Sequence, residues 1–334
     1  KAVWIMATNP VVSLPDADKV KEALKRCQLV VVSDCVEQTD TNAFAHVLLP
    51  AAAWGEKDGT VTNSDRRISR QRAFLKLPGE AKPDWWIISQ IAKRMGFAQA
   101  FGYESAYEIF REHAHLSGIH NDDARAFNIA GLAQLSEREY DELTPIQWPI
   151  PKAGHPGTER LFEDGRFYHE DRKARFVPTT PRAPVQRRDD EFPLVLNTGR
   201  IRDQWHTMTR SGKSPRLTTH IPEPYIDLHP QDALLAGTRE GELVRVSTKW
   251  GSMVARLRMS GEIPRGMVFV PIHWNSAFSS DARVGALVNP VVDPISGEPE
   301  LKHTPARVTP FIVSWHGFIL TKRPLANLDV TWWT

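Results

Sequence analysis

The chain has 334 residues, enough for two domains with full-sized cores, and its 25% charged and 41% hydrophobic residues are ordinary for a globular protein. A formal net charge of +2 argues against a nucleic-acid partner, and no apolar run approaches the ~20 residues of a membrane span. The two cysteines are too few for a disulfide framework or a four-cysteine cluster, and we expect reduced thiols in a cytoplasmic protein. The first residue is Lys1, already in an apolar run, which suggests a segment of a longer polypeptide.

Strand and helix patterns alternate over the first hundred residues. Continuous β-branched runs predict buried parallel strands, and an 11-residue amphipathic stretch predicts the first helix. The expected strands are residues 2–6, 29–32 and 47–49, and the expected helices are residues 16–26, 39–46 and 84–95. This alternation is typical of a doubly wound α/β domain, in which ligands bind at the carboxyl ends of the strands. Asn9 and Asp34 follow two such strands, so we expect both at one rim of the sheet.

The second half of the chain has a different pattern. Residues 100–135 are expected to be helical, and proline-rich residues beyond 140 are expected to form an extended connector. Short strands at 194–196, 243–246, 253–257 and 267–272, with a short helix at 230–237, then predict a closed β-barrel. The expected division is an α/β domain at 1–140, a connector at 141–190, a barrel at 191–320 and a tail at 321–334.

Three segments carry polar groups that suit a ligand. For Asp34, contact with a guanine or ribose and capping of the next helix are equally compatible with its position. Residues 54–67, rich in Gly, charge and hydroxyls, fit a solvated surface loop better than a phosphate site. Residues 197–210 follow a strand and hold three Arg, three Thr, one His and one Gly, which favours a polyanionic ligand. His273, at the end of another strand, is by position more often structural than catalytic.

Several short motifs, taken in order, resemble the molybdopterin oxidoreductase family, and within it the assimilatory and periplasmic nitrate reductases. The resemblance runs from about Ala2 to about Phe311. Its pieces are Thr8-Asn9-Pro10, Val32-Ser33-Asp34, Leu48-Leu49-Pro50, Glu56-Lys57-Asp58-Gly59-Thr60 with Asn63 and Arg66-Arg67, Pro83-Asp84-Trp85, Thr198-Gly199-Arg200 through Trp205-His206-Thr207, and Asn289 with Asp293-Pro294-Ile295-Ser296 and Lys302.

The resemblance implies a fold and a cofactor. The fold is part of the α/β region seen in formate dehydrogenase and DMSO reductase (their domains 1–3), followed by a β-barrel of the aspartate-decarboxylase-like double-psi type. The cofactor is molybdenum bis(molybdopterin guanine dinucleotide). Carried over by motif, its contacts fall on Asn9, Ser33, Asp34, Lys57, Asp84, Thr198, Gly199, Arg200, Arg202, Gln204, Trp205, His206, Thr207, Asn289 and Lys302.

The family's 4Fe-4S cluster and its protein ligand to molybdenum are expected in a preceding part of the polypeptide. No metal ligand is expected in this chain, and Cys35 is not interpreted as one. Residues 273–287 are longer than in the periplasmic enzymes, which favours the assimilatory type, and His273 is the candidate for a substrate funnel. No catalytic acid, base or nucleophile is predicted here.

The implied activity of the whole protein is two-electron reduction of nitrate to nitrite, with electrons from a donor protein or reductase subunit through the cluster. We expect the segment alone to be inactive and to expose an apolar face to the preceding half. The expected compartment is the cytoplasm, or the periplasm if a twin-arginine signal lies upstream. Two alternatives stay open: another member of the family, such as a formate dehydrogenase, and a non-catalytic guanine-dinucleotide-binding module.

Overall fold

The computed structural model describes residues 1–322 and 330–334. It contains two compact units: residues 1–48 with 182–334, and residues 49–181. The first unit therefore joins the two ends of the chain, and each unit is described by itself. The expected division into an α/β domain, a connector and a barrel stays a prediction, as does the tail, which includes residues 323–329 outside the described part.

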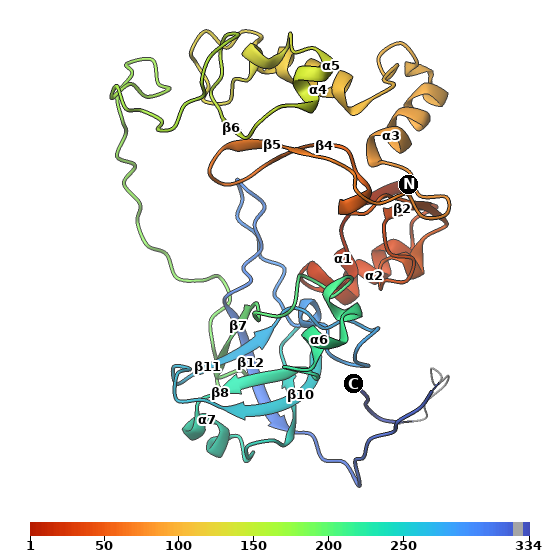
Figure 1. Cartoon of the computed structure of the whole chain (residues 1–334). Helices are drawn as coiled ribbons and strands as arrows, with labels where there is room; N and C mark the ends of the chain where they lie inside the picture. The colour runs from red at the N-terminus through yellow and green to blue at the C-terminus, as the bar shows by residue number, and fades with distance from the viewer. Residues whose placement is uncertain (323–329) are drawn as a thin grey trace. The chain divides into compact units, whose positions relative to one another are not determined.

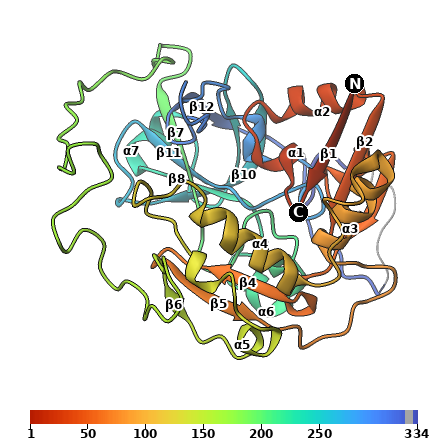
Figure 2. The ribbon, with the colours of Figure 1, turned by 90° about the horizontal axis from the view of Figure 1, so that it is seen from above.

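The N-terminal part of the first unit is a small α/β layer. Its sheet has the order β1-β2-β3, where β1 is Ala2–Met6, β2 is Leu29–Asp34 and β3 is Val47–Pro50. β1 and β2 are parallel, with Met6 opposite Ser33, so their carboxyl ends meet at one edge. α1 (Pro10–Ser13) and α2 (Ala17–Lys25) lie beside these strands (Figure 2). The apolar run of β2 buries Val30 and Val32 against Val11 of α1 and Leu24 of α2.

The helix expected at 39–46 is wrong in extent, because only a 3-10 turn, η1 (Asn42–Phe44), forms there. The side chain of Asn42 explains this. Its Nδ2 donates to the carbonyls of Val36 (2.7 Å) and Glu37 (3.1 Å), so it closes the preceding loop instead of facing solvent from a helix.

A closed six-stranded barrel forms the rest of this unit's core, in the order β10-β8-β11-β7-β12-β9. β7–β11 and β8–β10 are parallel pairs, and the remaining pairs are antiparallel. α6 and α7 lie at opposite ends of the barrel (Figure 1). The bounds are β7 Leu194–Gly199, η5 Ser211–Lys213, α6 Pro215–Thr218, β8 Tyr225–Leu228, α7 Pro230–Leu235, β9 Leu243–Ser247, β10 Ser252–Met259, β11 Met267–Pro271, η6 Val284–Ala286 and β12 Thr304–Pro310.

The sequence did not predict two of these strands. β8 has only four residues, all of them buried, so it shows no alternation of polar and apolar positions. β12 contains Pro305 as its second residue and Pro310 as its last. Proline in a run usually argues against a strand, because it cannot donate a hydrogen bond to the neighbouring strand. The fold class expected from the sequence is confirmed in both its α/β and its barrel parts.

The second unit is a three-stranded antiparallel sheet, β4-β5-β6, with helices packed on it. Arg70 of β5 is almost completely buried and reaches Asp58 (2.9 Å) and Asp141 of α5 (3.0 Å). Its guanidinium also lies 4.0 Å from the ring centroid of Tyr140, so one cation ties the hairpin to α5. The bounds are η2 Trp54–Glu56, β4 Gly59–Thr62, β5 Arg67–Gln71, α3 Asp84–Ala92, η3 Lys93–Phe97, α4 Ala106–Gly118, η4 Ala130–Leu132, α5 Glu137–Asp141 and β6 Ile146–Gln147.

Two expectations for this unit are corrected. The surface loop expected at 54–67 contains β4 and the start of β5. The β-branched run Thr60–Thr62 favours a strand, and it pairs antiparallel with Ile68–Arg70. The helix expected at 100–135 is wrong in extent: α4 ends at Gly118, and only the 3-10 helix η4 follows it in this range. A side chain at Gly118 would meet Cβ of Ala130 at 2.6 Å, and His120 already has the left-handed φ of 48°.

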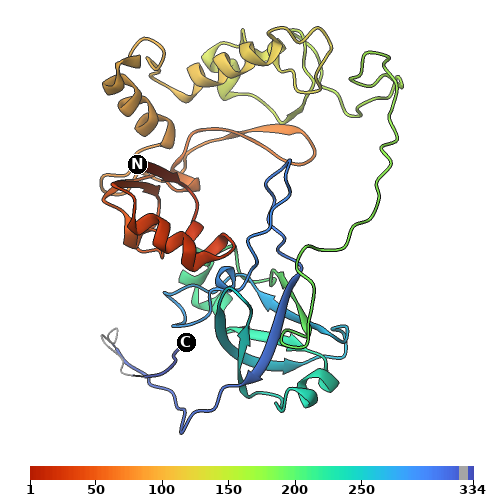
Figure 3. The same ribbon diagram turned by 180° about the vertical axis from the view of Figure 1, so that it is seen from behind.

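The expected connector has little regular structure. No helix or strand is assigned between β6 and β7 in the described chain, and Figure 3 shows this segment in green as an extended trace. A second excursion, from residue 289 to 303, leaves the barrel before β12 and closes on itself at the bridge between Val292 and Pro299. Among residues 1–322 and 330–334, no helix has the length and apolar character that crossing a membrane requires.

Candidate cofactor-binding site

The carboxyl edge of the β1–β2 pair supplies the first half of the site. Asn9 follows β1 and is only 7% exposed. Its Oδ1 accepts from Thr41 Oγ1 (2.6 Å), and its Nδ2 donates to Thr207 Oγ1 (3.3 Å). Asp34 ends β2, and its Oδ1 accepts from the Val36 amide at 3.1 Å. Asp34 therefore caps a turn and not a helix, which corrects one of its two interpretations.

The loop from residue 200 to 208, here called the barrel loop, supplies the second half. It begins directly after β7. Gln204 and Thr207 are buried, whereas Trp205 is 61% exposed and meets the His206 ring edge-on with 4.7 Å between centroids. His206 and Met208 have the left-handed φ values of 43° and 60°, which side-chain-bearing residues rarely adopt. The loop is thus an irregular backbone with some side chains turned in and others turned out.

The segment after β11 is hydrogen-bonded to the backbone of the barrel loop. His273 is fully buried, and its Nε2 accepts from the Ile201 amide at 2.9 Å. Its Nδ1 lies 2.6 Å from the His206 carbonyl oxygen, and Asn275 Nδ2 donates to the Thr207 carbonyl. Burial lowers the pKa of His273 below its usual range, because a charged imidazolium would lose its hydration there.

A cavity of about 240 Å³ lies where these halves meet, all within the first unit. One wall comes from the α/β layer and the other from the barrel. The single cation among its lining residues is Lys213, in η5. The lining residues are Asn9, Val36, Glu37, Gln38, Thr39, Met208, Thr209, Lys213, Asn275, Ala277 and Phe278.

Two donors of the barrel loop have no partner within the described residues. Gln204 is 5% exposed, and its amide orientation is set because Oε1 accepts from Ser211 Oγ at 2.8 Å. Its Nε2 is then buried without a hydrogen-bond acceptor. The Arg200 side chain is exposed and makes no hydrogen bond or ion pair in the described chain. A buried donor without an acceptor costs free energy, so this loop fits a ligand rich in acceptors and negative charge, as a pterin dinucleotide is.

Other predicted residues of the barrel are occupied by the protein itself. Arg202 is exposed and pairs with Asp203 at 3.0 Å. Asn289 is fully buried and donates to the His303 carbonyl and to Thr304 Oγ1, both at 2.9 Å. Lys302 donates to the carbonyl of Thr198. The contact of Lys302 fastens the 289–303 excursion to the end of β7.

Four predicted residues remain to be placed. Gly199 has the Phe269 ring so close that an added Cβ would meet it at 2.4 Å. Ser33 is fully buried, and its Oγ accepts from Trp4 Nε1 at 2.8 Å. Lys57 and Asp84 lie in the second unit, where they form an ion pair with each other. Their cofactor contacts, like those of the other predicted residues, stay predictions.

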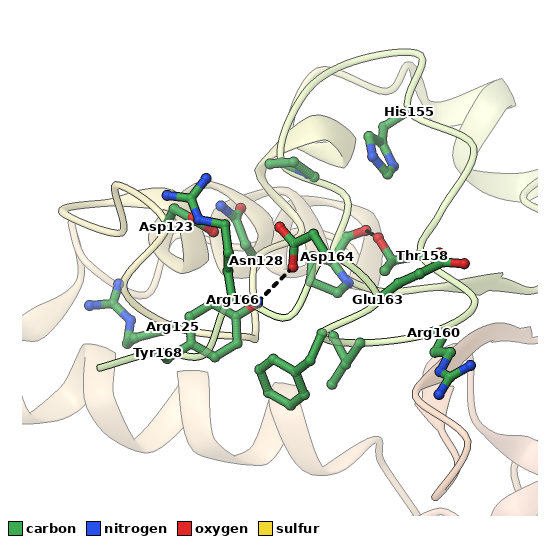
Figure 4. A pocket seen from close by; sticks show the side chains of 14 residues that line it. Asp123, Arg125, Asn128, His155, Thr158, Arg160, Glu163, Asp164, Arg166 and Tyr168 are labelled. Atoms are coloured by element: carbon green, nitrogen blue, oxygen red, sulfur yellow. Dashed lines mark hydrogen bonds between the residues drawn. The ribbon is translucent and has the colours of Figure 1, made fainter. Parts of the chain in front are cut away.

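A larger cavity, of about 620 Å³, lies in the second unit (Figure 4). It contains none of the predicted site residues. Charges of both signs line it, including Arg160 and Glu163, and most of its side chains are exposed. The Arg166 amide donates to Asp164 across this lining, as the dashed line in Figure 4 shows. Open, mixed-charge lining does not select one ligand, so we place the candidate site in the first unit.

The described residues hold no group of three or more His, Cys, Asp or Glu side chains arranged to bind a metal ion. Two protein-family models match the chain: "Molybdopterin oxidoreductase" over residues 1–94 and "Molydopterin dinucleotide binding domain" over residues 194–305. The chain belongs to the molybdopterin oxidoreductase family. The two matched segments include the two halves of the site, Asn9 with Asp34 and the whole barrel loop.

Relatives within the family carry different activities. A nitrate reductase of Klebsiella oxytoca is 49% identical over 97% of this chain, and the α subunit of an F420-dependent formate dehydrogenase of Methanocaldococcus jannaschii is 34% identical over 90%. The chain spans 37% and 42% of these relatives' own lengths. The solved structure of acetylene hydratase from Pelobacter acetylenicus matches 93% of this chain and 44% of its own, with a TM-score of 0.68 and 20% identity, which shows the shared fold alone.

The sequence pattern missed several residues of the site. Lys213 lies just beyond the polar segment 197–210. The neighbouring Gly212 could have indicated a close contact at this point, because an added Cβ there would meet the Phe278 ring at 2.4 Å. Thr41, which orients Asn9, has no signal in the sequence because it acts through a contact 32 residues away.

Proposed function

We propose that this chain is the cofactor-binding, C-terminal part of a molybdenum nitrate reductase. The observation that supports the cofactor is in the barrel loop, where the buried Nε2 of Gln204 lacks an acceptor and the exposed side chain of Arg200 makes no hydrogen bond or ion pair in the described chain. The observation that favours nitrate is the 49% identity to a nitrate reductase. When bound, molybdenum bis(molybdopterin guanine dinucleotide) supplies the metal for two-electron reduction of nitrate to nitrite.

The chain's own residues hold the dinucleotide. Arg200 neutralises pyrophosphate charge, and Gln204 donates to an acceptor atom of the cofactor. Asp34 accepts hydrogen bonds from a guanine edge with its second carboxylate oxygen. The family motifs imply further cofactor contacts at Lys57, Asp84, Asn289 and Lys302.

The rest of the proposal concerns the whole protein. We infer that a preceding part carries the 4Fe-4S cluster and the protein ligand to molybdenum, and that electrons reach it from a donor protein. The enzyme is then of the assimilatory type and works in the cytoplasm. The isolated segment has no turnover of its own, because the cluster and the protein ligand to molybdenum belong to the preceding part.

The test is nitrate-dependent oxidation of a reduced viologen dye by the full-length protein that contains this chain. Protein from cells grown with molybdate is compared with protein from cells grown with tungstate. We expect turnover in the first only, in proportion to bound molybdenum. Full molybdenum loading without nitrate turnover would refute the nitrate assignment.

A formate dehydrogenase is the second candidate, favoured by the 34% identity to the archaeal α subunit. The same preparation, given formate and an oxidised viologen, separates the two, because only a formate dehydrogenase reduces the dye. A purified protein that holds a guanine dinucleotide but no molybdenum would instead support the non-catalytic guanine-dinucleotide-binding module.

A further inference from the structure

The bonds of His273 define one protonation state of its ring. Its Nδ1 faces the His206 carbonyl oxygen at 2.6 Å, and a carbonyl only accepts, so Nδ1 carries the proton. Its Nε2 faces the Ile201 amide at 2.9 Å, and an amide only donates, so Nε2 carries none. The ring is therefore neutral with a fixed tautomer, and both of its polar atoms are used by the barrel loop.

These two bonds reach opposite ends of the barrel loop, at Ile201 and His206. Asn275, two residues further along, adds a bond to the Thr207 carbonyl. The loop has two left-handed residues, His206 and Met208, and such conformations persist only where surrounding groups hold them. Between the two anchors lies Gln204, which the proposed function assigns to the cofactor.

Packing alone does not require a histidine at this position. The adjacent Trp274 is 1% exposed and belongs to the apolar cluster of the barrel, where it packs edge-on near Tyr225. His273 and Asn275 flank it and turn to the loop instead, so the polar side chains after β11 serve the loop while the apolar one serves the core.

We propose that His273 is a positioning residue, which fixes the barrel loop in its cofactor-binding shape without itself touching the cofactor. This inference rests on the proposed function. The place of His273 in a substrate funnel stays a prediction; its complete burial and its two backbone bonds assign it this other task. The residue it acts through is Gln204, whose unpaired amide must face the ligand for the loop to bind it.

The test uses the full-length protein with three substitutions. His273→Phe removes both bonds and keeps a ring of similar size, and His273→Asn keeps a donor near the position of Nδ1. His229→Phe is the matched control, because that imidazole also accepts from a backbone amide, at Gln231, but lies at α7. Molybdenum and acid-released guanine nucleotide are measured per protein during dialysis, together with amide hydrogen exchange over residues 201–208.

We expect His273→Phe to lose both cofactor components at least roughly tenfold faster than wild type and to exchange the loop amides faster. His273→Asn should recover part of each effect, and His229→Phe should show neither. Equal retention and unchanged loop exchange in His273→Phe would overturn the inference. If His273→Phe does not fold, wild-type behaviour of His273→Asn in both measurements would overturn it, and partial loss would support it.

Failure of the proposed function would give a different result in the same experiment. In that case wild-type protein releases neither molybdenum nor guanine nucleotide. Hydrogen exchange then decides the role of His273 by itself: faster exchange of the loop in His273→Phe but not in His229→Phe supports positioning, and no difference overturns it.

Discussion

The two halves of the candidate site are built in opposite ways. At the β1–β2 edge, regular parallel strands bring Asn9 and Asp34 together, and short local bonds finish their orientation. In the barrel loop the backbone is irregular, and side chains from the segment after β11 hold its carbonyls. The first half inherits its geometry from the stability of a sheet, whereas the second depends on a few bonds. Substitutions should therefore act on overall stability in one case and on cofactor binding in the other.

The largest expected effect concerns the contact that joins the two halves. Gly285 of η6 packs against the α/β layer, and an added Cβ would meet the carbonyl oxygens of Val12 at 2.3 Å and Leu14 at 2.6 Å. Gly285→Ala should lower the free energy of unfolding by about 3 kcal/mol, because the backbone must move apart.

Urea denaturation of the full-length protein measures this effect. Gly261→Ala is the control, since nothing lies within 4 Å of its added Cβ. Equal midpoints for the two variants would show that the layer and the barrel are not closely packed at η6.

A smaller effect, on binding rather than folding, is expected at Gln204. Gln204→Met loses the bond from Ser211 but also removes the unpaired buried Nε2, and each change is worth about 1 kcal/mol with opposite sign. Stability without cofactor should thus stay nearly constant, while cofactor retention falls about tenfold, or ~1.4 kcal/mol.

Thermal unfolding of the cofactor-free protein and guanine-nucleotide content of the loaded protein separate the two parts of this prediction. Gln231→Met on α7, where the side chain is exposed, serves as the control. A stabilised apoprotein with undiminished cofactor content would mean that Nε2 of Gln204 meets no ligand.

The smallest expected effect is a dependence on pH. Because burial lowers the pKa of His273 in the folded state, the unfolded state binds this proton more readily. The contribution of His273 to stability is complete above the ordinary value of 6.5 and is lost as the pH falls through the lowered value. The hydrogen bond to the His206 carbonyl favours protonation of this ring, whereas the charges of the His206 and Arg200 side chains disfavour it.

Unfolding free energies measured from pH 8 to pH 5 should therefore fall more steeply for wild type than for His273→Asn. The difference between the two profiles isolates His273 from the other histidines. Parallel profiles would contradict a neutral, buried ring.

Much of this molecule follows from local sequence. The β-branched run of β2, the amphipathic stretch of α2 and the apolar strands of the barrel are local patterns. Each pattern predicts which residues are buried without knowledge of the segment that covers them. The polar segment after β7 likewise stood out by composition, and the family model confirms that it lies within a dinucleotide-binding domain.

The tertiary structure alone decided which polar groups are free and which are used. Asn289 and Lys302 carry an amide and a cation, as Gln204 and Arg200 do, yet protein atoms distant in sequence already bind these two side chains, as Trp4 binds Ser33. Nothing local distinguishes them, because a hydrogen bond across the fold depends on where another segment lies. The same holds for His273: sequence shows a single imidazole after a strand, and only the packed loop gives each ring nitrogen its partner.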